Sequence, residues 1–217
     1  MPRATQSLLI GQPRSYVEHY IKQLATKHKS YLKDTPDFLR HIKKYNETEV
    51  IPPNTILVTM DVSAMYTNIP HSDGIEATKE ALVGEMSDKH HVEFLVQLLT
   101  VILKNNIFEF DDHLYKQNVG TGMGLKPSPS YADIFMDKKI DVNMEKIIQN
   151  WDESKFIMQF FKRFLDDLFF IFVGSSKMVH ILLENVNKIH KNIKFTLKHT
   201  SIVGEANQCD CEFSESI

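Results

Sequence analysis

Cysteine, long apolar runs and an excess of positive charge are all scarce in this chain of 217 residues. The two cysteines, Cys209 and Cys211, are one residue apart and cannot cross-link distant segments, so we expect an intracellular protein of the nucleus or cytoplasm. Without a second cysteine pair they are also a poor zinc site. No run approaches the roughly 20 apolar residues of a membrane span, and the N-terminus lacks the apolar core of a signal peptide. We therefore expect no membrane association.

The formal net charge of −3 excludes a generally basic protein that coats nucleic acid, but the charge is unevenly distributed. Residues 1–44 carry nine Lys or Arg against three Asp or Glu, and residues 185–203 carry four Lys, two His and no acid. Basic flanks around an acidic centre suit an enzyme that binds phosphates at its flanks and metal ions at its centre. Solvated helix faces would give the same counts, so charge alone does not decide.

The most informative pair of residues is Asp166-Asp167, which stands between two phenylalanine-rich, β-prone runs. Asp is rare in strands and common in turns, so the pattern predicts a tight β-hairpin with both aspartates at its tip. A third carboxylate, Asp61, lies near the end of the β-branched run 55–62, which predicts a buried central strand. If this strand lies beside the hairpin, the three carboxylates converge. Converging carboxylates of this kind can hold the two Mg²⁺ ions that catalyse phosphoryl transfer.

Helices and strands are predicted to mix without a regular βαβ repeat, so the fold class is α+β rather than a doubly wound sheet. Thr35 is expected to cap a helix that has Pro36 in its first turn. A second hairpin is expected around Asp111-Asp112. Helices are predicted at 14–28, 35–44, 72–86, 88–105, 129–150 and 175–191, and strands at 55–62, 107–110, 114–117 and 193–200.

Three motifs follow one another along the chain. The first reads Met-Asp-Val-Ser-Ala-Met-Tyr-Thr-Asn-Ile-Pro-His at 60–71, and the third reads Arg-Phe-Leu-Asp-Asp at 163–167. The second combines Gly-Thr-Gly-Met-Gly at 120–124 with Pro-Ser-Tyr-Ala-Asp-Ile-Phe-Met at 129–136. From about Tyr16 to the C-terminus the sequence resembles the palm of reverse transcriptases, most closely the Penelope-like retroelement branch.

The resemblance implies a right-hand-polymerase palm, in which an antiparallel sheet has helices packed on one face. It divides the chain into partial fingers with N-terminal helices at 1–54 and a palm at 55–217, the latter with a helical and hairpin insertion at 67–118. The thumb and most of the fingers of such enzymes have no counterpart here, so we expect a piece of a longer element.

The implied activity is RNA-directed DNA polymerisation, with an RNA template, a DNA primer and deoxynucleoside triphosphates as partners. Two Mg²⁺ ions, which Mn²⁺ can replace, would support nucleotidyl transfer to the primer 3′-hydroxyl. By resemblance Asp61 and Asp166 bridge the two ions, Asp167 adds charge, and the carbonyl of Val62 is a further ligand.

The resemblance also assigns nucleotide-binding residues. Tyr66 would stack under the incoming sugar and exclude a 2′-hydroxyl, although a plain core aromatic would fit the same spacing. The loop containing Gly120, Thr121, Met123 and Gly124 would let the backbone approach the nucleotide and the template base without Cβ clashes. Without the other motifs, the same loop is a flexible turn before a proline-started helix.

Other polar residues have two interpretations. Arg163, next to the hairpin tip, is predicted to contact primer or template phosphate, and a cross-strand ion pair is the alternative. Lys194 and Lys198 fall in a late strand, where either is a possible general acid toward pyrophosphate. A solvated lysine on an edge strand is the interpretation we favour for both.

Two other functions compete with polymerisation. One is a truncated, catalytically inactive retroelement remnant that at most binds nucleic acid. The other is a metal-dependent nucleotidyltransferase or nuclease that shares only the motif order, but it needs a further carboxylate or histidine for which the sequence offers no good candidate.

Overall fold

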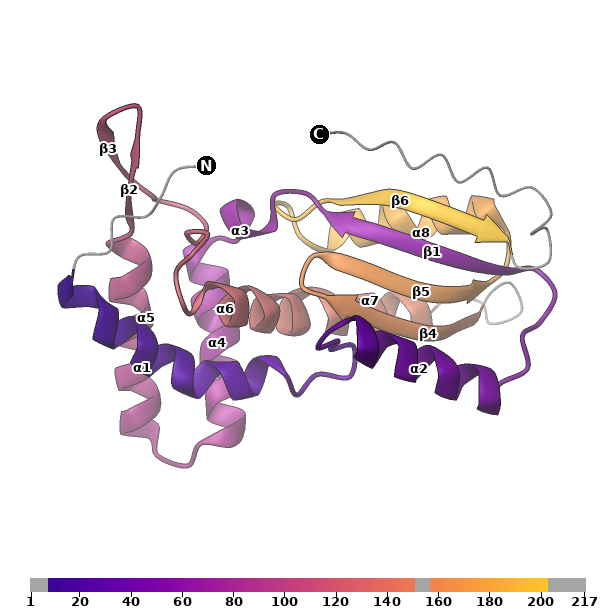
Figure 1. The fold of residues 1–217 in the computed structure, drawn as a ribbon, viewed down its shortest axis with the longest axis horizontal. Helices are drawn as coiled ribbons and strands as arrows, with labels where there is room; N and C mark the ends of the chain where they lie inside the picture. Colours follow the sequence, from indigo (N-terminus) through magenta and orange to yellow (C-terminus); the bar gives the residue numbers. More distant parts are fainter. Residues whose placement is uncertain (1–7, 151–156, 203–217) are drawn as a thin grey trace.

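A four-stranded antiparallel sheet brings together the strands that contain the predicted aspartates (Figure 1). The computed structural model describes residues 8–150 and 157–202. Helices cover one face of the sheet and continue into a helical layer beside it, so the predicted α+β class is confirmed. In spatial order the strands are β4 (Ile157–Phe164), β5 (Asp167–Val173), β1 (Thr55–Val62) and β6 (Phe195–Ile202).

Strand β1 lies inside the sheet because its side chains alternate between an apolar and a more polar face. Ile56, Val58 and Met60 are buried, whereas Thr59 and Asp61 on the opposite face are partly exposed. Strands β5 and β6 pair with β1 on its two edges. The strand boundaries predicted from the β-branched run are confirmed, and the position of the aspartate near its end follows directly.

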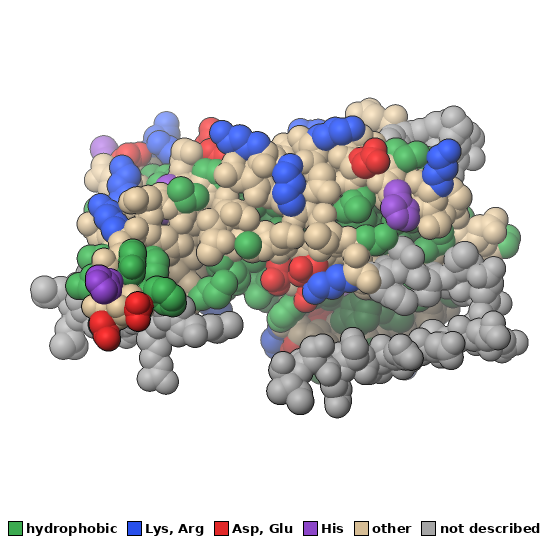
Figure 2. Space-filling model, turned by 90° about the horizontal axis from the view of Figure 1, so that it is seen from above, with side chains coloured by type: hydrophobic (Ala, Val, Ile, Leu, Met, Phe, Trp, Pro, Cys, Tyr) green, Lys and Arg blue, Asp and Glu red, His purple; other side chains and the backbone are tan. Residues whose placement is uncertain are grey.

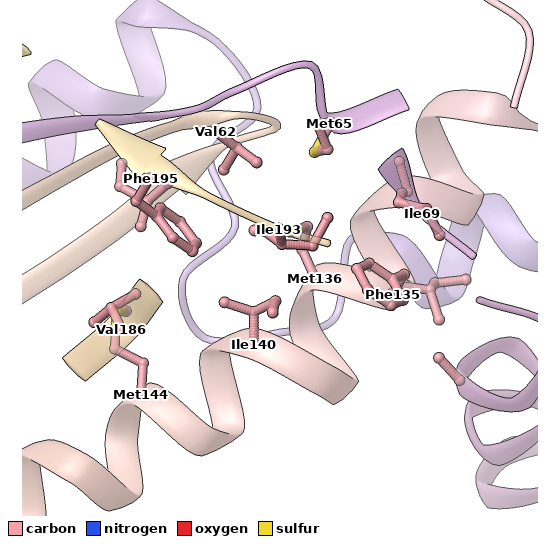
Figure 3. Packing of buried hydrophobic residues seen from close by; sticks show 14 of the residues in the cluster. Val62, Met65, Ile69, Phe135, Met136, Ile140, Met144, Val186, Ile193 and Phe195 are labelled. Atoms are coloured by element: carbon pink, nitrogen blue, oxygen red, sulfur yellow. The ribbon is translucent and has the colours of Figure 1, made fainter. Parts of the chain in front are cut away.

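One long helical segment underlies the buried face of the sheet. It runs through α6 (Ser128–Phe135), the π-helical segment η1 (Met136–Asp141) and α7 (Val142–Gln149). Helix α8 (Ser176–Ile189) lies beside α7. Figure 3 shows the contact layer, in which apolar side chains of these helices meet those of the sheet: Ile140, Met144, Val186, Val62 and Phe195.

The π-helical segment is a difference from the single regular helix predicted over 129–150. A π-turn adds one residue to the turn and rotates the following side chains relative to an α-helix. Apolar spacing did not reveal it, because buried residues occur on both sides of the segment. The segment contains Asp137 and Asp141 as well as the buried Met136.

A second layer contains α1 (Leu8–Ala25), α4 (His71–Glu85) and α5 (Lys89–Lys104), which pack on one another and on α6 (Figure 1). All three were predicted: the boundaries of α4 and α5 differ from the prediction by one residue, whereas α1 begins six residues and ends three residues earlier than predicted. Among the described residues, no helix combines the length and apolarity that crossing a membrane requires.

Helix α2 (Thr35–Thr48) lies over β4 and β5 on the face of the sheet opposite the long helical segment. The ring of Phe38 contacts the ring of Phe169 edge-on at 4.9 Å between centroids. The expected cap was wrong by one residue, because the carboxylate of Asp34 accepts the hydrogen bond from Asp37 N–H at 2.9 Å and Thr35 is already helical.

The hairpin β2 (Ile107–Phe110) and β3 (His113–Lys116) projects from the helical layer at the end of the molecule (Figure 1). Its residues are almost all exposed, and Figure 2 shows hydrophobic and acidic side chains next to a histidine at this end. The predicted hairpin is confirmed, with Asp111-Asp112 as its turn.

Candidate active site

Two of the three predicted carboxylates face each other across neighbouring strands. Asp61, near the end of β1, is the register partner of Asp167, the first residue of β5. The third, Asp166, is tied to the end of β1 by its backbone, because Val62 N–H donates to the Asp166 carbonyl at 3.0 Å. The structure thus brings Asp61, Val62, Asp166 and Asp167 to the same end of the sheet.

The turn of this hairpin differs from the prediction in one residue. Its two turn residues are Leu165 and Asp166, since Asp167 already pairs with Phe164 within the sheet. Leu165 takes the left-handed backbone conformation, with φ of 54°. An aspartate with one strand partner on each side is held more firmly than a turn residue, so Asp167 is part of the sheet edge facing Asp61.

Lys198 on β6 joins the two facing carboxylates. Its Nζ lies 3.1 Å from Oδ1 of Asp61 and 3.1 Å from Oδ1 of Asp167, so the two oxygens are separated by no more than twice this distance. Hydrogen bonds with Asp167 and Asp61 raise the pKa of Lys198. The expectation of a solvated lysine on an edge strand is confirmed, since β6 is an edge strand and Lys198 is half exposed, but its ammonium is also the counter-charge of the two carboxylates.

Negative charge is concentrated around Asp166. Burial raises the pKa of its carboxyl, and the charges of Asp167 and Asp61 raise it further. The hydrogen bond from its own backbone N–H lowers the pKa but does not outweigh these effects. The same field reaches Tyr66, whose pKa is raised by burial and then by the charges of Asp166 and Asp133. Such an arrangement favours a cation, which is the expected property of a site for divalent metal ions.

Arg163 does not face a phosphate in this structure. Arg163 is only 1% exposed to solvent, and its guanidinium forms ion pairs with Asp133 of α6 and Asp141 of η1. Burial alone would lower the pKa of Arg163, but the charges of Asp141 and Asp133 outweigh it. The prediction of a phosphate contact is therefore corrected, and the ion pair runs to the helices rather than across strands.

The buried arginine instead positions the hairpin turn. Its Nη1 donates to the Leu165 carbonyl at 3.0 Å, and its Nε donates to Asp141 Oδ2 at 3.0 Å. Burial opposes ionisation of Asp133, yet the hydrogen bond from His28 and the charge of Arg163 hold the pKa of Asp133 below its usual range. These carboxylates were missed, although aspartates that recur at steps of four residues lie on one face of a helix and are a usable signal.

Gly120 connects the second motif to the first. Its φ of 77° is unfavourable for other residues, and a Cβ there would lie 2.4 Å from the carbonyl oxygen of Tyr66. Gly120 N–H donates to Ile69 O at 3.0 Å, and Thr121 N–H donates to Tyr66 O at 2.7 Å. The glycine therefore allows the loop to lie against the backbone that carries Tyr66, at the short helix α3 (Met65–Asn68).

The four loop residues predicted to bind nucleotide divide into two pairs. Gly120 and Thr121 are buried, and the hydroxyl of Thr121 bonds with that of Ser128 at 2.5 Å. Met123 and Gly124 are exposed, Met123 to 61%, and Gly124 has φ of 95° with open space around it. The first pair supports the loop, and the second is free to contact a ligand.

A groove of about 570 Å³ begins beside the carboxylates. Asp167 and Lys198 form its polar end, and Leu32, Phe38 and Phe169 contribute to its apolar walls. The groove lies on the side of the sheet that helix α2 only partly covers. The site thus combines clustered negative charge with an adjoining space open to a substrate.

Solved structures with a similar fold include telomerases and viral RNA polymerases. A telomerase from Candida tropicalis, in complex with a fragment of telomeric RNA, superposes with a TM-score of 0.64 at 11% identity over 93% of this chain and 34% of its own. The Candida albicans telomerase gives 0.62 at 13% identity over 92% and 34%. An RNA polymerase complex inside a dsRNA virus gives 0.58 at 12% identity over 85% and 18%.

These likenesses establish the polymerase palm fold, and the chain spans about a third of the telomerase chains. No curated protein sequence matches the chain. Residues 10–203 match the family model described as reverse transcriptase (RNA-dependent DNA polymerase). Since this match contains all three motifs and most of the sequence, the chain belongs to the reverse transcriptase (RNA-dependent DNA polymerase) family.

Proposed function

We propose that this chain is the palm of an RNA-directed DNA polymerase that adds deoxynucleotides to a primer 3′-hydroxyl. The observation that carries the proposal is the convergence of Asp61 and Asp167 on one ammonium, with Asp166 at the adjoining turn. Carboxylates on two neighbouring strand ends, next to an open groove, suit a reaction in which phosphate charge is neutralised by metal ions.

The residues present fit a pair of divalent cations. Lys198 already occupies the space between two carboxylates, which shows that this position stabilises positive charge. The carboxylates of Asp61, Asp166 and Asp167, with the carbonyl of Val62, would hold two Mg²⁺ ions, or Mn²⁺ in their place. When bound, the ions would activate the primer hydroxyl and neutralise the triphosphate and the departing pyrophosphate. Lys198 must release its carboxylates for this to happen.

Tyr66 and the exposed part of the loop are the proposed nucleotide contacts. The charge of Asp166 contributes to the raised pKa of Tyr66, so the two side chains lie near each other. The ring of Tyr66 therefore suits the position under the incoming sugar. Met123 and Gly124 would meet the base, while Gly120 and Thr121 act as positioning residues that hold the loop against Tyr66.

The finer assignments are also proposals. Motif detail supports a retrotransposon of the Penelope-like branch, whose palm would use an RNA template, a DNA primer and deoxynucleoside triphosphates, inside the cell and away from membranes. The helices before residue 55 would form partial fingers, residues 55–217 the palm, and residues 67–118 an insertion within it. The β2–β3 hairpin, which projects from the helical layer, supports this division.

Primer extension on an RNA template, with Mg²⁺ or Mn²⁺, tests the proposal. The chain is assayed alone and within a form extended at both ends, each with an Asp166→Asn variant. We expect Asp166→Asn to reduce extension by about 10³-fold, which corresponds to about 4 kcal/mol of transition-state stabilisation. Asp112→Asn is the matched control, because it changes an aspartate of the exposed hairpin turn, and it should leave the rate unchanged.

A folded extended form that shows no extension under either ion would contradict the polymerase and favour an inactive remnant. Equal loss in both variants would show that the assay reports general charge rather than the site. Activity that persists in Asp166→Asn would remove this carboxylate from the proposed metal ligands.

A further inference from the structure

A second group of metal-ligating side chains lies at the junction of the helices and the sheet. It consists of His28, just after α1, and of Asp137 and Asp141 on η1. One ligand atom of each lies within 4.8 Å of those of the other two. Within the described ranges, this is the group of three His, Cys, Asp or Glu side chains whose ligand atoms all lie within 4.8 Å of one another. Ligand atoms around one Zn²⁺ lie closer together than this limit, so the three side chains would have to turn slightly toward a bound ion.

The group opens onto a cavity. His28 and Asp141 have side chains that are 3% and 5% exposed, and that of Asp137 is 21% exposed. All three line a cavity of about 320 Å³, together with Ser30 and Glu145. This volume accommodates an ion and several water molecules that complete its coordination.

Asp141 has an acceptor without a donor. Its Oδ2 accepts from Ser30 Oγ at 2.8 Å and from Arg163 Nε at 3.0 Å. Its Oδ1 is buried and has no hydrogen-bond partner in the part of the chain that the structure describes. A buried carboxylate oxygen without a partner is costly, so it points to a ligand.

Each ring nitrogen of His28 lies near an oxygen atom of another side chain. Its Nε2 lies 3.3 Å from Asp133 Oδ2, and its Nδ1 lies 2.8 Å from Ser30 Oγ. The proton of Ser30 is directed to Asp141, so an Nδ1 lone pair would face an oxygen with no proton to give. A histidine whose Nε2–H donates to a carboxylate, with Nδ1 toward a cation, is a recurrent metal-site arrangement.

The charges around Arg163 also leave room for a cation. Two buried carboxylates, Asp133 and Asp141, share one guanidinium. Asp137 adds a third carboxylate, and Lys138 contacts it at 3.2 Å from a partly exposed position. An ion bound here would displace this lysine into solvent.

We propose that His28, Asp137 and Asp141 bind one divalent cation, separate from the candidate catalytic ions. One imidazole and two carboxylates suit Zn²⁺, which combines nitrogen and oxygen ligands with water in a fourth position. Through Asp141 the ion would hold Arg163, which in turn holds the Leu165 carbonyl of the hairpin turn. The site therefore stabilises the hairpin that carries Asp166.

Calorimetric titration of the full chain with Zn²⁺ tests this site. The protein carries Cys209→Ser and Cys211→Ser, so that no thiolate contributes to the zinc that is measured. Asp137→Asn removes the most exposed ligand with the least effect on folding. Glu145→Gln is the matched control, since it removes one charge from the same cavity, two turns further along the helix, without removing a ligand. Asp166→Asn separates this site from the candidate catalytic one.

We expect one Zn²⁺ per chain at this site, at least about tenfold weaker in Asp137→Asn and changed by less than about threefold in Glu145→Gln and Asp166→Asn. Lys138→Met should strengthen binding, since it removes the competing ammonium. Absence of binding in the parent would overturn the proposal. Equal binding by the parent and Asp137→Asn, or equal losses in Asp137→Asn and Glu145→Gln, would overturn it as well.

Discussion

The hairpins β2–β3 and β4–β5 each have two consecutive aspartates in or directly beside the turn, yet their surroundings differ. In the first, Asp111 and Asp112 form the turn itself, with φ of 51° and 57°, and the strands beside them are exposed. In the second, β5 pairs with β1, Asp167 faces Asp61, and Asp166 is partly buried. Asp111 and Asp112 lie at the end of a two-stranded sheet that has no third strand.

The comparison shows that the dipeptide alone does not build a site. What distinguishes β4–β5 is the set of elements around it: β1 contributes a third carboxylate, β6 contributes Lys198, and the helices contribute partners for Arg163. Each of these supports can be removed singly. For each removal, a variant in the exposed β2–β3 hairpin serves as the reference against which the effect is measured.

Removal of the buried arginine should have the largest effect on stability. Arg163→Met leaves Asp133 and Asp141 buried without their guanidinium, and loss of one partner of a buried ion pair costs about 3–5 kcal/mol. The matched change in the exposed hairpin, Lys116→Met, should alter stability by less than about 0.5 kcal/mol. Urea unfolding followed by circular dichroism measures both. A loss below about 1 kcal/mol in Arg163→Met would mean that the carboxylates are neutral or otherwise compensated.

The loop that supports Tyr66 should be the next most sensitive feature. Gly120→Ala places a Cβ against the Tyr66 carbonyl at a positive φ, and we expect a loss of about 1–3 kcal/mol. Gly84→Ala in α4 meets no atom within 4 Å, so it should be neutral or stabilising by up to about 1 kcal/mol. Thermal unfolding of the two variants compares them. Similar melting temperatures would indicate that the loop relaxes away from Tyr66.

Much of this fold could be predicted because its elements are local patterns. The β-branched run of β1, the turn signals of both hairpins and the caps near Asp34 and Asp88 each depend on a few adjacent residues. The π-helical segment could not be predicted, because its extra residue per turn depends on packing against the sheet rather than on residue type.

The candidate site was predictable in its carboxylates and less so in its basic residues. Asp61 and Asp167 meet because strand pairing places them in register, which the motif order suggests. Arg163 looks like a phosphate ligand from sequence, since nothing local shows that Asp133 and Asp141 lie behind it. Lys198 looks like a solvated lysine, because its two partners come from strands about 30 and 140 residues away in the chain.

A smaller effect is expected at Lys198. Lys198→Met removes the counter-charge of Asp61 and Asp167, and because the lysine is half exposed, the loss should be about 0.5–1 kcal/mol at neutral pH. Mg²⁺ should stabilise this variant more than the parent, since no ammonium competes for the carboxylates. Urea unfolding with and without Mg²⁺ tests both statements. If the ion stabilises both proteins equally, Lys198 does not occupy the position of a cation.

The smallest effect concerns Asp166 and has the opposite sign. Because burial and the neighbouring carboxylates raise its pKa above the usual 3.8 of an aspartate, the folded state binds the proton more tightly than the unfolded state. The stabilisation that protonated Asp166 contributes is present below pH 3.8 and is lost as the pH rises through the pKa of the folded state. At neutral pH, ionised Asp166 therefore destabilises the folded protein. Asp166→Asn should therefore stabilise the fold at pH 7 by a few tenths of a kcal/mol, a gain that shrinks toward pH 4. Urea unfolding between these pH values measures it, with Asp112→Asn as the reference. A gain independent of pH would assign the effect to packing, whereas a gain that follows the titration would mean that the carboxylate proposed as a metal ligand is also one that weakens the fold.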